Sequence, residues 1–144
     1  MTNVVIASND EVCQSAKNWF VNSQGYLEGF ENFSELSEDS KLIIIGHDEE
    51  LGDGDELLAL LQEQDFPMVD FEVILIVCSA HSLKCTKDII TPAEKIANSL
   101  RRVVWAATDT VYGQWDQDGA HFSGTYIAVE PDSDILSKFR QMTL

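Results

Sequence analysis

Three nearly unbroken apolar runs constrain the fold more than any other feature of this chain. They read "KLIIIG", "EVILIVC" and "VVWAAT" and occupy residues 41–46, 72–78 and 103–108. Strands of this kind are typical of a parallel sheet whose two faces are both covered by helices. Segments with helical spacing separate the runs, so right-handed crossovers predict a three-layer α/β/α sandwich with a mainly parallel central sheet.

The remaining segments complete this alternation. A short β-branched run at residues 3–7 predicts a first strand, and residues 124–131 predict a fifth. Residues 25–40 carry glycines and serines, which favour a loop with a short irregular element. Helices are expected at four places: residues 8–23, 51–65, 91–102 and 133–142. Because no linker, repeat or change of composition interrupts the pattern, we expect one domain over residues 1–144.

The chain is strongly acidic. Its 144 residues include nine basic and 25 acidic side chains, for a net charge of −16. Phosphate repels such a surface, which argues against nucleic acid as a partner. The negative charge would favour a basic protein or peptide as a partner or substrate. A role in solubility alone would also account for the charge.

Targeting and cofactor signals are missing from the sequence. No apolar run approaches the roughly 20 residues of a membrane helix, and the first residues do not form a cleavable secretory signal. Three cysteines make an odd number and show neither a disulfide framework nor zinc-site spacing. We therefore expect a cytoplasmic protein, or one exported without a cleavable signal, with no metal or cofactor and no membrane contact.

Two chemically active residues directly follow apolar runs. His47 ends the stretch "KLIIIGH", and Cys78 ends "FEVILIVC". Ligands and catalytic groups of open parallel sheets gather just past the carboxyl ends of the strands. A histidine near a cysteine can lower the thiol pKa and can protonate a leaving group. The alternative is that Cys78 is a small buried hydrophobic residue and His47 an ordinary loop residue.

This order of elements resembles the clan CD cysteine peptidases, which include caspases, gingipains, legumains, separase and the self-processing domains of large bacterial toxins. The resemblance covers "KLIIIGHD" through "VVWAATDTVYG" and is closest in pattern to the toxin domains. It implies a caspase-like fold in which His47 is the general acid/base and Cys78 the nucleophile. The backbone N–H groups of Asp48 and Cys78 would form the oxyanion hole.

The same resemblance suggests where a substrate would bind. In the clan, substrate pockets are built partly from the region after the apolar run at residues 103–108, where Asp109 and Tyr112 stand. Asp109 could select a basic side chain of a peptide substrate, or it could be an ordinary loop acid. Weaker candidates for a role near the site are His81 as a rival imidazole and Cys85 as a resolving thiol.

A second hypothesis is a catalytically idle protein on the same fold. Asp48 stands where clan members mostly have glycine, and Val77 stands where they have alanine or glycine. Together with the acidic charge, these departures would fit an immunity or chaperone-like subunit of a bacterial toxin system that binds a basic partner.

Overall fold

The computed structural model of the chain describes residues 2–47, 55–64, 71–77, 91–108, 111, 113–116 and 119–131. The strands are β1 (Val4–Ala7), β2 (Leu27–Glu28), β3 (Lys41–Ile45), β4 (Glu72–Ile76), β5 (Val104–Ala107), β6 (Gly113–Asp116), β7 (Gly119–Phe122) and β8 (Tyr126–Val129). The helices are α1 (Glu11–Gln24), the 3-10 helix η1 (Phe30–Glu35), α3 (Asp55–Gln62) and α4 (Pro92–Leu100).

Six of the strands form one mostly parallel sheet in the order β2-β1-β3-β4-β5-β8. Only β8 runs antiparallel to its neighbour in this sheet. The adjacent strands β3 and β4 pair in a register that sets Ile45 beside Ile76. The predicted α/β architecture with a mainly parallel sheet is therefore confirmed.

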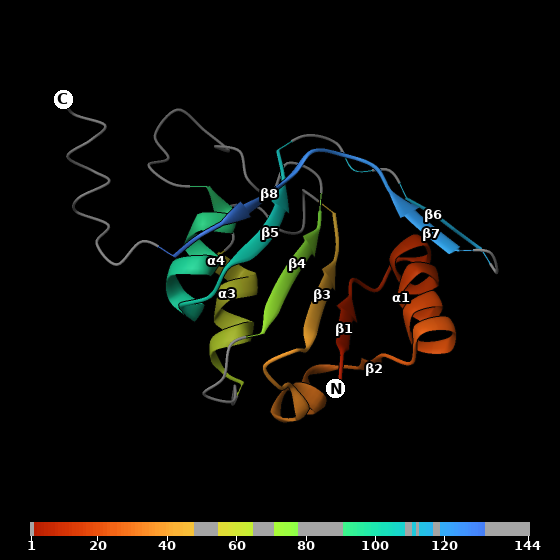
Figure 1. The fold of residues 1–144 in the computed structure, drawn as a ribbon, viewed down its shortest axis with the longest axis horizontal. Helices are drawn as coiled ribbons and strands as arrows, with labels where there is room; N and C mark the ends of the chain where they lie inside the picture. The colour runs from red at the N-terminus through yellow and green to blue at the C-terminus, as the bar shows by residue number, and fades with distance from the viewer. Residues whose placement is uncertain are drawn as a thin grey trace.

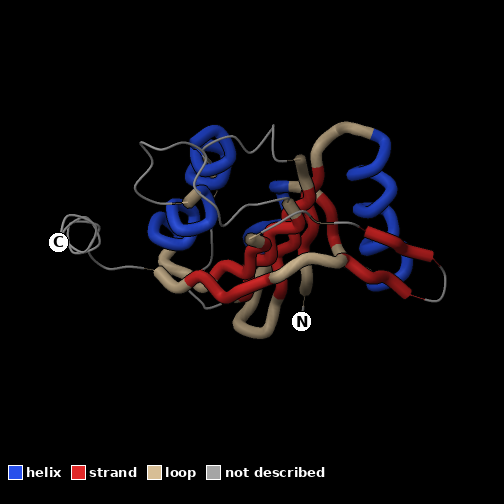
Figure 2. The backbone as a smooth tube through the Cα atoms, turned by 90° about the horizontal axis from the view of Figure 1, so that it is seen from above, coloured by secondary structure: helices blue, strands red, loops and turns tan. Residues whose placement is uncertain are grey.

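Helices lie on both sides of this sheet, as Figures 1 and 2 show, with α1 on one side and α3 and α4 on the other. Side chains alternate along each strand and feed two separate cores. On β3, Ile43 and Ile45 belong to the core beneath α1, whereas Leu42 and Ile44 belong to the core beneath α3 and α4. The layers are those of a three-layer α/β sandwich.

The helix α1 begins at a polar cap and ends at a glycine. The Asp10 side chain accepts a hydrogen bond from the Cys13 backbone N–H, which satisfies one of the free donors of the first turn. Gly25 ends the helix with φ at 73°, a left-handed conformation that glycine adopts at little cost. Between these ends, the buried face of α1 presents Cys13, Ala16 and Phe20 to the sheet.

On the opposite side, α4 has the helix start that its sequence predicts. The Thr91 hydroxyl accepts from the Glu94 N–H, and the Glu94 carboxylate accepts from the Thr91 N–H, each at 3.1 Å. This reciprocal capping box precedes a helix whose buried face includes Ile96 and Leu100. Leu61 of α3 lies in the same core and is fully buried.

Two features differ from the sequence-based expectations. The two-residue strand β2 pairs in parallel with β1, within a segment expected to be a loop. A hairpin of β6 and β7, likewise expected to be a loop, pairs outside the main sheet. It lies beside α1, where Phe122 stacks on Phe20 at a centroid distance of 5.9 Å. These short strands were missed because long-range contacts, rather than a local apolar period, hold them in place.

The expected closing helix at residues 133–142 lies outside the described residues. Among the helices that are described, none has the length and apolar character needed to cross a bilayer.

Candidate functional site

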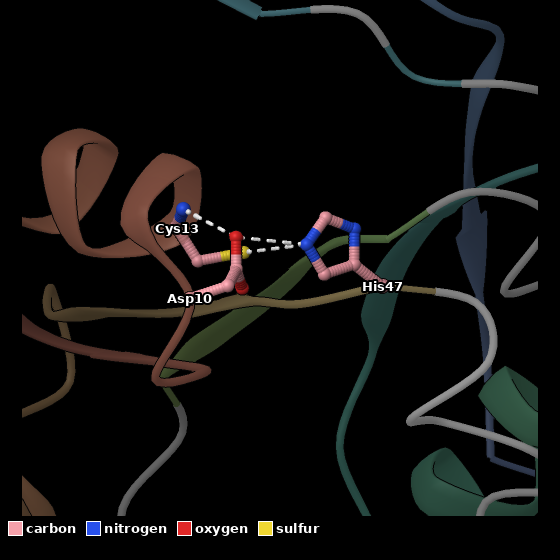
Figure 3. A group of neighbouring side chains, drawn as sticks. All are labelled: Asp10, Cys13 and His47. Carbon is pink, nitrogen blue, oxygen red and sulfur yellow. Dashed lines mark hydrogen bonds and ion pairs between the residues drawn. The ribbon is translucent and has the colours of Figure 1, made fainter.

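Three side chains from two segments meet past the carboxyl ends of β1 and β3. His47 Nε2 lies 2.9 Å from Asp10 Oδ2 and 3.6 Å from Cys13 Sγ. Asp10 Oδ2 also accepts the Cys13 backbone N–H at 3.2 Å. Figure 3 shows the imidazole edge directed at the carboxylate and the thiol of α1's first turn. We refer to Asp10, Cys13 and His47 as the DCH cluster.

Two features of the sheet bring the cluster together: β1 and β3 are neighbouring strands, and side chains alternate between the two sides of the sheet. Asp10 and Cys13 follow β1, and His47 follows β3, the strand that pairs with β1 in parallel. Parallel neighbours end at the same edge of a sheet, so the residues after them are close in space. Side chains alternate along β3, which puts Ile43 and Ile45 on the α1 side of the sheet. His47 is two residues after Ile45, so the same alternation directs it to that side.

The Asp10 carboxylate is the electrostatic centre of the cluster. Its hydrogen bond with His47, followed by that with the Cys13 side chain, holds the pKa of Asp10 well below its usual range. An ionised carboxylate accepts but cannot donate, so Nε2 of His47 must carry the proton of the 2.9 Å contact. In a neutral imidazole this assigns the lone pair to Nδ1. Figure 3 shows Nδ1 on the far side of the ring from Asp10 and Cys13.

The three side chains differ in their access to solvent. Cys13 is buried, whereas the side chains of His47 and Asp10 are 51% and 35% exposed. His47 and Gly46 line a cleft of about 500 Å³ together with Val77 and residues of α3. His47 also borders a smaller hollow of about 90 Å³ beside Cys13. The imidazole is thus the group of the cluster that an approaching molecule meets first.

Among the predicted site residues, His47 is the one that the structure describes. Cys78, Asp48, Asp109 and Tyr112 lie outside the described residues, as do His81 and Cys85. The pairing of His47 with Cys78 therefore stays a prediction. What is confirmed is the adjacency of the strands that precede them, since β3 and β4 are hydrogen-bonded neighbours.

Asp10 and Cys13 are the functional candidates that the sequence analysis did not select. Both stand in the segment expected to form the first helix, residues 8–23, where the sequence assigns them no further role. A usable signal existed, because both follow the first strand closely, as His47 follows the apolar run at residues 41–46. What could not be read from the sequence was that these two strands are neighbours in the sheet.

Comparison of the chain with protein-family models, with curated proteins and with solved structures finds no match.

Proposed function

We propose that this protein is a cysteine peptidase of the caspase-like kind, in which His47 is the general acid/base and Cys78 the nucleophile. The observation that carries the proposal is the geometry of His47. The ring stands at the carboxyl end of β3, half-exposed at the 500 Å³ cleft, with one nitrogen held by a carboxylate. A histidine oriented by an ionised acid matches the common arrangement in which a catalytic base is held by a third group.

The strand register supports Cys78 as the partner of this histidine. Ile45 pairs with Ile76, and His47 and Cys78 are each the second residue after that pair. Ile76 belongs to the core beneath α1, as Ile45 does. The proposal requires that Cys78 keep this alternation, so that its thiol and the His47 ring share one side of the sheet.

Cys13 is the weaker candidate for the nucleophile although it is the nearer sulfur in the described structure. Its exposed fraction is 3%, which leaves a substrate carbonyl no approach. It also contacts Nε2, the nitrogen whose proton Asp10 accepts, and not Nδ1. We therefore assign Cys13 and Asp10 to holding the ring.

The reaction follows from these roles. His47 Nδ1 takes the proton of the Cys78 thiol, and the thiolate attacks the carbonyl carbon of the scissile peptide bond. The C–N bond then breaks as the imidazolium returns its proton to the leaving amine, which leaves an acyl-enzyme. Water, deprotonated by the same nitrogen, hydrolyses the thioester and regenerates the thiol. The N–H groups of Asp48 and Cys78 are the proposed oxyanion hole.

A basic peptide is the substrate class that the acidic chain favours. Glu56 of α3 lines the cleft and is exposed. The proposed selectivity residues Asp109 and Tyr112 would add a second carboxylate and an aromatic ring, and a lysine or arginine side chain would pair with such a set.

The proposal is tested by mapping thiol reactivity residue by residue. Native protein is treated briefly with iodoacetamide, and the labelling of Cys13, Cys78 and Cys85 is quantified by mass spectrometry in the parent and in His47→Gln. We expect Cys78 to react fastest in the parent and to lose at least about tenfold in rate in the variant, because the imidazole favours the thiolate. Cys85, which serves as the internal control, should not change.

Hydrolysis supplies the second arm of this test. Fluorogenic peptides with a basic or an acidic residue before the scissile bond are offered to the parent, Cys78→Ala and Cys85→Ala. Cleavage of the basic set that disappears only in Cys78→Ala is the expected result. Full activity in Cys78→Ala, or labelling of Cys78 no faster than that of Cys85, would refute the assignment.

The idle binding protein remains a second candidate because of one surface feature. Five exposed acids fall within twelve residues around η1: Glu28, Glu31, Glu35, Glu38 and Asp39. A basic partner bound there would be released as salt shortens the Debye length from about 10 Å at 0.1 M to about 3 Å at 1 M. Salt-sensitive capture of a basic protein by a Cys78→Ala variant, without peptide cleavage by the parent, would favour this candidate.

A further inference from the structure

The DCH cluster contains one ligand atom of each of the three kinds, oxygen, sulfur and nitrogen, with which proteins bind transition metals such as zinc. Asp10 offers a carboxylate oxygen, Cys13 a sulfur and His47 an imidazole nitrogen, and these atoms all lie within 4.8 Å of one another. Zinc sites in proteins draw on these three donor types, and three protein ligands with one open position characterise the catalytic class of zinc site. Calcium and magnesium, in contrast, prefer oxygen ligands throughout.

The distances fit a tetrahedral ion. Zn–S and Zn–N bonds of about 2.3 and 2.05 Å, at a tetrahedral angle, put sulfur and nitrogen about 3.6 Å apart. The separation of Cys13 Sγ and His47 Nε2 is 3.6 Å. The corresponding N···O separation for zinc is about 3.4 Å, and Asp10 Oδ2 lies 2.9 Å from Nε2. A small rotation of the half-exposed His47 side chain would open that contact enough to admit the ion.

The ligands are also held in place before any ion arrives. Asp10 and Cys13 are fixed relative to one another by the helix cap, because the Cys13 N–H donates to Oδ2. Such a hydrogen bond to a ligating carboxylate is typical of the outer shell of metal sites. The second oxygen, Oδ1, is buried and has no hydrogen-bond partner among the described residues. A cation beside the carboxylate would compensate this unsatisfied acceptor.

We propose that Asp10, Cys13 and His47 form a binding site for a divalent transition ion of the zinc class. Cys13 Sγ, His47 Nε2 and one Asp10 oxygen are the ligands, and the exposed side of His47 leaves a fourth position to water. On binding, Cys13 gives up its thiol proton to solvent, and the proton on Nε2 of His47 is replaced by the metal while Nδ1 becomes protonated. The site does not depend on peptidase activity.

One consequence does rest on the proposed function. Because the metal occupies Nε2 and leaves the proton on Nδ1, His47 cannot act as a base while the ion is bound. The zinc form would therefore be an inactive form of the peptidase. If zinc binds and no peptide is ever cleaved, the metal site stands and the peptidase proposal fails.

Cobalt is the probe that tests the site directly. Chelator-treated protein is titrated with Co²⁺, whose tetrahedral complexes absorb in the visible and whose thiolate complexes add a sulfur-to-metal charge-transfer band. We expect one ion per chain, the charge-transfer band, and displacement of cobalt by Zn²⁺ but not by Mg²⁺. Absence of a one-to-one complex would overturn the proposal.

Matched variants decide which residues bind. Cys13→Ser should remove the charge-transfer band, and each of Cys13→Ser and His47→Gln should weaken zinc binding by at least about 100-fold, the upper end of the effect of losing an outer-shell partner. Asp10→Asn retains a helix cap and tests the carboxylate alone. Cys78→Ser and Cys85→Ser are the controls and should bind as the parent does. A band that survives in Cys13→Ser but disappears in Cys78→Ser would refute the site.

Discussion

At the scale of single residues, the chemistry centres on Asp10. Its carboxylate caps α1 by accepting the Cys13 N–H and also holds the His47 ring, two tasks performed by one short side chain. Aspartate suits them together because an ionised carboxylate has about four lone-pair sites. The orientation of His47 therefore depends on a residue whose position is set by a helix start.

A change of pH isolates the charge of Asp10. The hydrogen bonds from His47 and Cys13 lower the pKa of Asp10 in the folded protein, below the value of about 3.9 of an unfolded chain. The carboxylate therefore stabilises the fold above pH 4, and this contribution is lost as the pH falls further through the folded-state pKa. Asp10→Asn keeps the cap but has no such titration.

We expect the difference in unfolding free energy between parent and Asp10→Asn to shrink as the pH falls below about 4. Urea titrations across pH 2.5 to 7 measure it. A difference that stays flat over the whole range would show that Asp10 is not held in its charged form.

At the scale of elements, the residue at which a helix begins can be predicted from its capping residues when only one good cap is present. The Thr91, Pro92 and Glu94 pattern predicts the start of α4, and the structure has the complete capping box at that point. The start of α1 was less definite, because Ser8, Asn9 and Asp10 are all good caps. The structure selects Asp10, and with it the carboxylate that meets His47.

Removing the α4 cap tests the stability that this local signal provides. Thr91→Ala leaves the N–H of Glu94 without its side-chain acceptor, and Thr91 is 6% exposed. We expect a loss of about 1 kcal/mol in the free energy of unfolding. Thr91→Ser keeps the hydroxyl and is the control, with a smaller loss measured by the same denaturant titration. Equal losses in the two variants would show that packing of the methyl group, and not the cap, is responsible.

At the scale of the whole molecule, stability resides in the two cores on either side of the sheet. Leu75 of β4 is fully buried beneath α3 and α4, whereas Leu60 of α3 is 47% exposed. We expect Leu75→Ala to cost about 2–5 kcal/mol, because it removes buried methyl groups and leaves a cavity. Leu60→Ala should cost less than about 0.5 kcal/mol. Thermal unfolding followed by circular dichroism distinguishes them, and similar midpoints would contradict the assigned core.

The sequence was sufficient for the four longer parallel strands, β1, β3, β4 and β5, and for the helices α1, α3 and α4. A buried strand and an amphipathic helix each leave a short-range period in hydrophobicity, and caps such as that of Thr91 add a local boundary. The apolar run before His47 likewise predicts that this residue lies just past the carboxyl end of a strand, and β3 ends at Ile45. All of this information lies within a few residues of the feature it predicts.

Tertiary structure alone decided which groups meet there. Cys13 and His47 are 34 residues apart, and their contact depends on β1 lying next to β3 in the sheet order. The β6–β7 hairpin is held by contacts such as that of Phe122 with Phe20. No local pattern encodes a neighbour that is distant in sequence, because pairing free energy arises only once both strands have been brought together. The longer strands and the cap of α4 could thus be read from the chain, whereas the DCH cluster required the assembled sheet.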